Sequence, residues 1–531
     1  MTLARTYSVA LVGVEGHLVE VEADIENGLV ALLLVGLPDT ALREARDRIR
    51  AAIVNSKEDW PNRRITVGLS PASLPKRGSG FDVGIAVAIM AAAGVAPVDV
   101  LDRVVFLGEL GLDGGLRPVR GVLPAVAAAS AAGFSQVVVP QDNAAEAQIV
   151  PGMHVFAMPS LQAVLGWIRA GAPAVTFDDE QEPRPGRRLQ VVREPHPIAA
   201  PGKPAAAADQ SSGPDLADVL GQPVARRAAE ICAAGGHHLM LLGPPGTGKT
   251  MLAERIPSIL PTLDWAAALE VTSIHSIAGA LPPDRPLISE PPFCGPHHTA
   301  TKASIVGGGS GMIRPGAASL AHMGILFLDE APEFDRDVLD ALRQPLESGQ
   351  VVLARARLTA RFPARFTLVL AANPCPCARA GGSQAGCVCT PMVRRRYLGR
   401  LSGPLLDRVD VKVEFLPVGR AELLSDGKSA EPSSVVAARV QAARDRAAHR
   451  LAGTSWRMNA EVPGSELRRR FTPAPGALKP LEHAIEIGEI SARGVDRVLR
   501  VAWTLADLAG KPRPGADETC YALGLWLGVG A

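Results

Sequence analysis

The sequence has almost no net charge, since 55 lysines and arginines stand against 54 aspartates and glutamates. This balance excludes a global positive field, so any contact with a polyanion must be local. The sequence also has no long hydrophobic run: the longest, residues 83–96, is shorter than the roughly 18 to 20 residues that cross a bilayer. The first 24 residues show no signal-peptide cleavage pattern. We therefore expect a soluble, cytoplasmic protein with no membrane partner.

Aromatic residues and cysteines are scarce. Aromatic side chains make up 4% of the chain. Seven cysteines in 531 residues, four of them within residues 375–389, do not form the pattern of a secreted disulfide framework. Reduced thiols in a cytosol are the simpler interpretation.

Composition divides the chain into four regions. We expect a first domain over residues 1–168, a linker over 169–214, a second domain over 215–420 and a helical region over 421–531. The linker is rich in proline, glycine, alanine and charge without periodicity, so it cannot bury a core.

The first domain mixes strands and helices. Residues 17–25, HLVEVEADI, alternate like a half-buried strand, and residues 31–37, ALLLVGL, form a continuous apolar run like a central one. Apolar residues then recur at helical spacing from Leu42 to Ile53, and the arginines of this helix lie largely off that stripe: Arg43, Arg46, Arg48 and Arg50. We expect these arginines to form an ordinary solvated face; contact with a partner is the alternative.

A phosphate-binding loop follows the apolar stretch HLMLL. The motif GPPGTGKT consists of Gly243, Pro244, Pro245, Gly246, Thr247, Gly248, Lys249 and Thr250. Such a loop turns backbone N–H groups toward phosphate oxygens, and the helix behind it adds its positive end. We expect Lys249 to reach the β- and γ-phosphates of ATP and Thr250 to bind Mg²⁺.

Two later strands end in polar residues. GILFLDE, residues 324–330, predicts a buried strand followed by Asp329 for the Mg²⁺ shell and Glu330 to polarise the attacking water. An acidic turn after a strand is the alternative, and the upstream loop favours nucleotide hydrolysis. TLVLAAN ends at Asn373, whose amide can orient that water and sense the γ-phosphate.

Two arginines complete the predicted catalytic set. Arg408, in GPLLDRVD, follows a predicted helix and is placed to reach the γ-phosphate of a neighbouring subunit. Arg493, in ISARGVDRVLRVA, begins a C-terminal helix and is placed to contact the phosphate of its own subunit. Either arginine alone would suit a salt bridge better; the other motifs favour the catalytic interpretation.

This set of motifs resembles the AAA+ ATPases, and within them the magnesium-chelatase-like branch and its ComM/YifB competence-related group. The resemblance rests on GLVALLLVGLPDTALREARDRIRAAIVNS, LGELGLDGGLRPVRGVLPA, GPPGTGKTMLAERIPSILP, PFCGPHHTATKASIVGGG, SLAHMGILFLDEAPEFDRDVLDALRQPLESG, NPCPC and RLSGPLLDRVD. It implies an α/β protein: a Lon-protease-like α+β N-terminal domain, an AAA+ P-loop α/β core and a helical C-terminal lid.

The resemblance also implies a function. It implies a hexameric ring with ATP and Mg²⁺ bound between subunits, and a DNA helicase that promotes branch migration of recombination intermediates, with branched or single-stranded DNA as the partner. The sequence departs from the family pattern at Cys294, Ala317, Met323 and Ala378. None of these positions belongs to the hydrolysis set.

The Lon-like region departs from an active protease. Asp82 stands where the family's serine nucleophile falls, and GVLPAVAAA contains no lysine. Ser79 and Lys76 lie nearby, and we interpret them as loop residues. We expect a protease fold without protease activity.

DNA contacts are expected from two insertions in the core. The resemblance implies a hairpin between the strands that end at Glu330 and Asn373, which would carry Arg355, Arg357 and Arg361 toward the ring's pore, and a second insertion that carries Lys302. Such contacts bind phosphates without sequence preference. The alternative is that these arginines pair with acids of neighbouring subunits.

Cys375, Cys377, Cys387 and Cys389 form two Cys-x-Cys pairs, and four thiolates can hold Zn²⁺ tetrahedrally. Spacing alone leaves this evenly balanced against four reduced thiols, and the family's recurrent pairing favours zinc. Two other functions remain open: a chelatase-type motor for tetrapyrroles, which lacks its D-x-S-x-S partner motif here, and a protein-remodelling motor.

Overall fold

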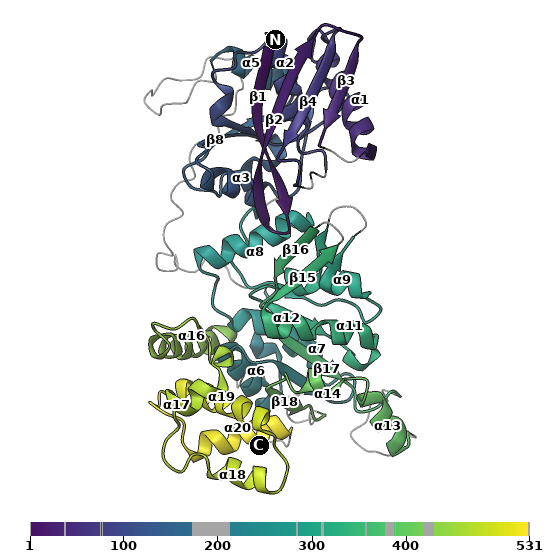
Figure 1. Ribbon diagram of the computed structural model, residues 1–531. Coiled ribbons are helices and arrows are strands. Elements are labelled where there is room, and N and C mark those ends of the chain that lie inside the picture. The colour runs from purple at the N-terminus through teal and green to yellow at the C-terminus, as the bar shows by residue number, and fades with distance from the viewer. Residues whose placement is uncertain are drawn as a thin grey trace.

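A computed structural model describes residues 2–36, 39–74, 76, 78–171, 213–282, 285–309, 313–355, 358–377, 387, 389–417 and 430–528, without the side chains of residues 2, 39–43 and 358. Within these ranges the chain runs from an N-terminal sheet at one end, through a second sheet, to a group of helices at the other end (Figure 1). Most of the predicted linker and Arg357 lie outside the described residues.

The N-terminal region contains a seven-stranded sheet in the order β3-β4-β2-β1-β5-β8-β9. Its strands are β1 (Thr2–Val12), β2 (Glu15–Glu26), β3 (Ala31–Val35), β4 (Arg64–Ser70), β5 (Val104–Phe106), β8 (Gln136–Pro140) and β9 (His154–Met158). Its helices are α1 (Asp39–Asn55), α2 (Asp82–Ala92), α3 (Val122–Ala131), α4 (Ala144–Ala147) and α5 (Leu161–Arg169), and β6 (Glu109–Leu110) and β7 (Leu116–Arg117) form a small hairpin.

The strand predictions for this sheet had mixed success. The alternation of HLVEVEADI is confirmed in β2, where Val19, Val21 and Ala23 are buried and the residues between them are partly exposed. The prediction of a central strand at residues 31–37 is wrong, because β3 is an edge strand whose Leu33 and Val35 are exposed. An apolar run shows that a strand exists, but it does not show how many neighbours the strand has.

The core contains a five-stranded parallel sheet in the order β11-β14-β17-β10-β18. Its strands are β10 (Leu239–Leu242), β11 (Phe293–Cys294), β14 (Ile325–Leu328), β17 (Thr367–Ala372) and β18 (Val411–Glu414). The surrounding helices are α6 (Pro223–Gly235), α7 (Lys249–Arg255), α8 (Trp265–Ala278), α9 (Lys302–Val306), α10 (Ala317–Leu320), α11 (Arg336–Ala341), α12 (Arg343–Ser348), α13 (Pro391–Leu398) and α14 (Gly403–Leu406). Alternate residues of β10 join apolar clusters on opposite faces, so both faces of the sheet are covered.

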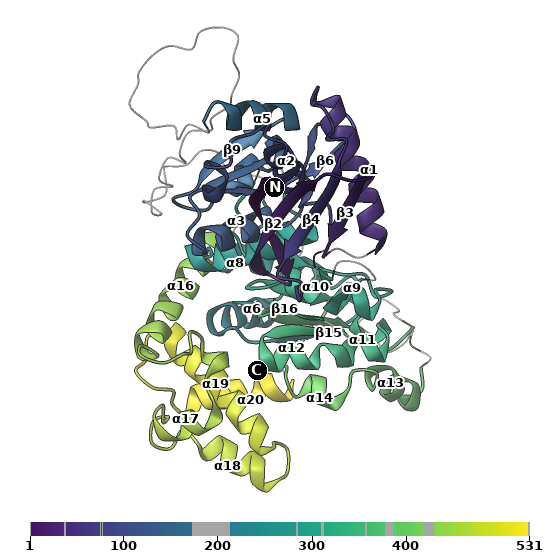
Figure 2. The same cartoon turned by 45° about the horizontal axis from the view of Figure 1, so that its top comes forward.

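Two hairpins project from the core toward the N-terminal sheet: β12 (Gly307–Gly308) with β13 (Arg314–Pro315), and β15 (Gln350–Arg355) with β16 (Leu358–Pro363). Ala360 and Phe362 of β16 are fully buried in a cluster that also contains Leu11 and Val14, at the turn between β1 and β2. Figures 1 and 2 both show the end of the β1–β2 pair against this hairpin. The N-terminal region therefore packs directly on the second hairpin.

The C-terminal region is helical: α16 (Ser433–Arg450), α17 (Gly464–Arg469), α18 (Lys479–Glu486), α19 (Ala492–Leu508) and α20 (Ala516–Leu527). Val498, Leu499 and Ala502 of α19 are buried in the same apolar cluster as β10 and α6. The helices therefore pack on one face of the core sheet. Among the described residues, no helix is long and apolar enough to cross a membrane.

Candidate nucleotide site

The phosphate-binding loop lies where predicted, between β10 and α7. Gly246 and Gly248 have φ angles of 77° and 95°, a left-handed conformation that side-chain-bearing residues rarely adopt. Thr247 closes the loop by donating its hydroxyl to the carbonyl of Pro244 at 2.8 Å. The loop therefore presents a cradle of backbone at the start of α7.

Lys249 points into this cradle and is 7% exposed. Its Nζ donates hydrogen bonds to the carbonyl oxygens of Gly243 and Pro244, each at 2.7 Å, and to Oδ1 of Asn373 at 3.2 Å. Burial lowers the pKa of Lys249. The ammonium group is thus held at the point where the loop and the strand end of β17 meet.

Asp329 and Thr250 lie side by side. The Thr250 hydroxyl donates to Oδ2 of Asp329 at 2.7 Å, and the other carboxylate oxygen accepts the backbone N–H of Glu330 at 2.9 Å. A hydroxyl and a carboxylate that converge in this way offer the oxygen ligands that Mg²⁺ prefers. The residues present therefore fit a magnesium ion.

The sheet brings three separate motifs together. β17 lies between β10 and β14, and all three strands run parallel, so the loop, Glu330 and Asn373 meet at one edge. Glu330 has φ = 49°, so its backbone turns sharply at the strand end. The sequence-predicted residues Lys249, Thr250, Asp329, Glu330 and Asn373 form one site.

Comparisons with known proteins match nearly the full length of this chain. The family model described as "Magnesium chelatase, subunit ChlI" matches residues 215–423, "Subunit ChlI of Mg-chelatase" matches 21–143, and "Magnesium chelatase, subunit ChlI C-terminal" matches 430–525. YifB of Escherichia coli is 40% identical over 96% of this chain and 94% of its own length. The competence protein ComM of Haemophilus influenzae is 39% identical over 99% of this chain and 97% of its own length.

The chain belongs to the magnesium-chelatase-like ComM/YifB family. An uncharacterized protein of Mycobacterium tuberculosis is 51% identical over 98% of both chains. The resemblance drawn from the motifs is therefore confirmed.

Arg408 and Arg493 lie apart from the cradle in this ComM/YifB chain. Arg408 donates to a carboxylate oxygen of Glu347 and to the carbonyl of Pro404, and its side chain is 11% exposed. Arg493 is exposed in the first turn of α19. Neither arginine has a hydrogen bond or ion pair with the loop within the described part of the chain.

Two features beside the site could not be predicted from the sequence. Nδ1 of His298 lies 3.6 Å from a carboxylate oxygen of Glu330, so a histidine faces the glutamate that is predicted to polarise the attacking water. The separation of His298 and Glu330 in the sequence gives no signal of this contact.

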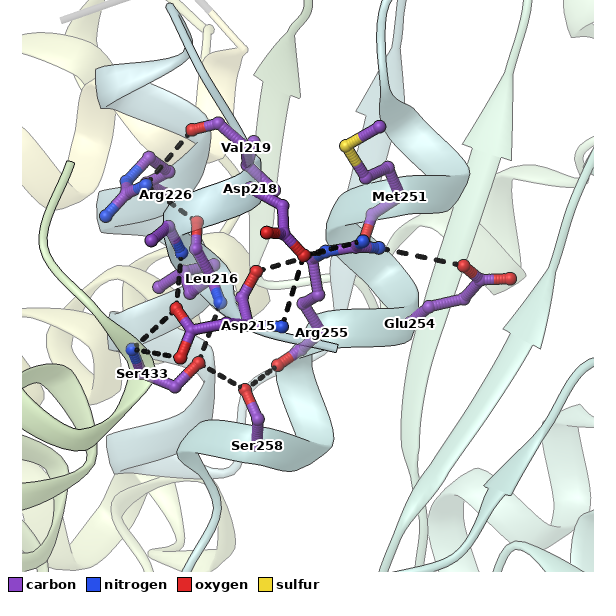
Figure 3. Close-up of polar contacts among 11 residues, drawn as sticks. Asp215, Leu216, Asp218, Val219, Arg226, Met251, Glu254, Arg255, Ser258 and Ser433 are labelled. Atoms are coloured by element: carbon purple, nitrogen blue, oxygen red, sulfur yellow. Dashed lines mark hydrogen bonds and ion pairs between the residues drawn. The ribbon is translucent and has the colours of Figure 1, made fainter. Parts of the chain in front are cut away.

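The second missed feature is a polar clip on the P-loop helix (Figure 3). Arg255 of α7 donates to Oδ2 of Asp218 at 2.9 Å and to the carbonyl of Asp215 at 3.1 Å, while Ser433 at the start of α16 accepts the N–H of Leu216 at 2.7 Å. Figure 3 shows Asp215 and Asp218 between these partners. The clip joins three segments: residues 215–218, where the core begins; helix α7, which carries Thr250; and α16, the first C-terminal helix.

The four cysteines predicted to bind zinc converge. Cys375, Cys377, Cys387 and Cys389 offer sulfur atoms that all lie within 4.8 Å of one another. The Sγ–Sγ distances are 3.2 Å for Cys375–Cys377, 3.4 Å for Cys375–Cys387 and 3.5 Å for Cys377–Cys387. Ligands 2.3 Å from a tetrahedral Zn²⁺ lie about 3.8 Å apart, so the donor set fits this ion.

The candidate DNA contacts do not share one surface. Cross-strand pairing places Arg355 on the hairpin face that carries Phe362, and Arg361 on the opposite face. Both side chains are exposed, as is Lys302 at the start of α9. Arg355 and Arg361 therefore lie on different faces of the hairpin, and their contact with DNA stays a prediction.

In the N-terminal region Asp82 is buried beside Arg48. Arg48 donates to both carboxylate oxygens, at 2.6 and 3.1 Å. Ser79 donates to Glu109, and Lys76 donates to the carbonyl of Pro71 at 2.5 Å. The prediction of a solvated face for α1 is thus wrong at Arg48, because its partner lies 34 residues away in sequence and no local pattern reveals it.

Proposed function

We propose that this protein is an ATP-hydrolysing AAA+ ring motor that acts on DNA, as a helicase that promotes branch migration of recombination intermediates. The observation that carries the ATPase proposal is the meeting of Lys249, Thr250, Asp329 and Asn373 at one sheet edge. The DNA proposal is supported by the near full-length similarity to a relative described as a competence protein. We propose that this activity is cytoplasmic.

The cradle supports hydrolysis through its own residues. Lys249 and the loop N–H groups bind the terminal phosphates, and Thr250 with Asp329 holds Mg²⁺, which neutralises charge that develops on the phosphates. Glu330 polarises the attacking water, and Asn373 orients it while its Oδ1 contacts Lys249. Binding of a γ-phosphate competes for the Lys249 ammonium group and so alters the Lys249–Asn373 contact.

The arginines that lie outside the cradle suit a site completed by a second subunit. Arg408 is presented on the short turn after α14 and acts on the γ-phosphate of the neighbouring subunit in a hexameric ring. Arg493 acts from the C-terminal helices, which serve as a lid on their own core. Arg408 must then exchange its partner Glu347 for a phosphate when subunits assemble.

The DNA grip comes from the second hairpin and from Lys302. Arg355 and Arg361 project from opposite faces of the hairpin, so they contact different phosphates of a strand that passes it. The N-terminal region, which we take to be a Lon-like fold without protease activity, supports the hairpin through Leu11 and Val14. An aspartate paired with arginine in place of a serine nucleophile favours this scaffold role.

The cysteine cluster is proposed to hold one Zn²⁺ as a structural ion. Cys375 lies two residues after Asn373, and α13 follows Cys389 closely. A bound ion would fix the chain between the γ-phosphate sensor and the segment that leads to Arg408.

The test is the ATPase rate of the purified protein with no DNA, single-stranded DNA and branched DNA, in the wild type and in Arg355→Glu and Arg361→Glu variants. DNA should raise the wild-type rate, and each variant should lose this stimulation while it keeps basal hydrolysis. Arg336→Glu, an exposed change on α11 away from the hairpin, is the matched control. A rate that does not respond to DNA, or that responds to unfolded protein instead, overturns the DNA proposal and favours a protein-remodelling or chelatase-type motor.

A further inference from the structure

A buried carboxylate lies at the start of β18. Asp410 is 1% exposed. One carboxylate oxygen accepts the backbone N–H of His238 at 3.1 Å, and the other accepts Nη1 of Arg497 at 2.9 Å. A buried charge is tolerated only when it is paired and hydrogen-bonded, so these partners are required for Asp410 to remain ionised.

The surroundings of Asp410 come from both the core and the C-terminal helices. Nδ1 of His237 lies 3.6 Å from Asp410, and Nε2 of the same ring is 2.7 Å from the hydroxyl of Thr504 on α19. Burial acts to raise the pKa of Asp410, but Arg497 and the two histidines outweigh it and hold this pKa well below its usual range. Arg497 thus binds α19 to the core through an ion pair with Asp410, and Thr504 does so through a hydrogen bond with His237.

Asp410 and Arg497 are each close in sequence to one of the two arginines that lie outside the cradle, Arg408 and Arg493. Arg408 precedes Asp410 by two residues, and both belong to the turn that leads into β18. Arg493 precedes Arg497 by four residues, which is about one turn of the same helix. A displacement of α19 therefore moves the segment that carries Arg408, and the reverse.

We propose that the Asp410–Arg497 ion pair couples neighbouring ATP sites in the ring, because it joins the lid segment of Arg493 to the segment that presents Arg408 to the next subunit. This inference rests on the proposed roles of these two arginines. Asp410 and Arg497 are positioning residues and do not touch the nucleotide themselves. The segment that carries Arg408 also forms an ion pair with Glu347, which lies three residues before β15 of the second hairpin. The hairpin is therefore linked to the same segment.

The experiment uses the full-length ring and the double variant Asp410→Asn with Arg497→Met. This variant removes both charges and nearly preserves volume, so no unpaired charge stays buried. Asp496→Asn is the matched control. Asp496 precedes Arg497 on α19, and this change breaks its ion pair with Arg468, which is more exposed than the Asp410–Arg497 pair. Arg497→Lys keeps the charge and serves where the double variant does not assemble.

Two readouts separate coupling from stability. The first is the Hill coefficient of ATP hydrolysis, which should fall to about 1 in the double variant and stay at the wild-type value in the control. The second is the ATPase activity of rings that contain an increasing fraction of Glu330→Gln subunits. Wild-type activity should fall by more than this fraction predicts, whereas the activity of the double variant should fall in proportion to it. Nucleotide affinity should change by less than about twofold, because neither residue contacts the cradle.

The outcomes are distinguishable. A folded, assembled variant with the wild-type Hill coefficient and mixing curve overturns the coupling role, and so does a wild type whose sites are independent. An Arg408→Ala ring as active as the wild type instead overturns the proposed function on which the inference rests.

Discussion

Lys249 donates a hydrogen bond to Asn373 across 124 residues of sequence, with Nζ and Oδ1 3.2 Å apart. The contact exists because β10 and β17 are adjacent and parallel, so that the loop after β10, which leads to Lys249, lies beside the end of β17. In the function proposed above, Asn373 would therefore respond to a change at the terminal phosphate. The cysteine cluster, a candidate site for a structural ion, begins two residues after this asparagine.

Glu330→Gln should separate binding from hydrolysis. The amide cannot take a proton from water, so turnover should fall by about 10² to 10⁴-fold, while ATP affinity stays close to that of the wild type. Nucleotide binding by fluorescence and phosphate release in a single-turnover assay measure the two effects. Loss of both ATP binding and hydrolysis would mean that Glu330 maintains the structure of the site and does not act as the base.

Arg408 should act in trans. Lys249→Ala and Arg408→Ala rings should each be nearly inactive, because one lacks a competent cradle and the other lacks its neighbour's arginine. Mixed rings of the two variants contain interfaces with an intact cradle and an intact arginine, so mixing should restore part of the ATPase activity. If mixtures remain as inactive as their components, Arg408 serves its own subunit or none.

The cradle could be predicted from sequence because each of its motifs is local. A glycine-rich loop after an apolar stretch can be recognised from a few adjacent residues, and so can polar residues that follow a strand. A parallel sheet then brings the ends of these strands to one edge. The positions of Lys249, Asp329 and Asn373 followed from this reasoning. The placement of Arg361 did not, because the pairing register that assigns a hairpin face is set by the partner strand.

Contacts between distant residues could not be predicted. Arg48 with Asp82, His298 with Glu330 and Asp410 with Arg497 join segments whose separation in sequence carries no periodicity. Burial of such pairs depends on tertiary packing, which the local pattern does not encode.

Met323→Asn should stabilise the protein. Met323 has φ = 58°, and a left-handed conformation costs a residue of this kind about 1–2 kcal/mol, whereas asparagine adopts it more readily. We expect a gain of about 0.5–1 kcal/mol in the free energy of unfolding, measured by chemical denaturation. Met323→Ala, which keeps the strain, should show no such gain; equal gains in both variants would point to the side chain and not to the backbone.

The core should lose stability in acid through His238. Burial lowers the pKa of His238 to about 4, and its Nδ1 accepts the N–H of Leu368 at 3.0 Å. Because this folded-state pKa lies below the ordinary value of about 6.5, the unfolded chain binds the proton first, and stability is lost as the pH falls from about 6.5 to about 4. His238→Asn retains an acceptor but cannot titrate.

Unfolding of the wild type and His238→Asn should be compared across this range. Relative to the variant, the wild type should lose up to about 3 kcal/mol on acidification. A difference between the two that does not change with pH would show that His238 is not the titrating group.

Zinc should copurify with the protein at about one ion per chain, measured by elemental analysis of protein made without a histidine tag. Cys387→Ser should lower this ratio, whereas Cys520→Ser, which changes an exposed cysteine outside the cluster, should not. Protein that contains no zinc before any chelator is added would show that the four cysteines are reduced thiols.

The most direct test of the central claim is ATP-driven branch migration of a synthetic four-way DNA junction. The wild type should separate the junction into its two product duplexes only when ATP is present, and Glu330→Gln should bind the junction without separating it. Separation that proceeds equally with Glu330→Gln, or a wild type that hydrolyses ATP at the same rate with and without the junction and leaves it intact, would contradict the account.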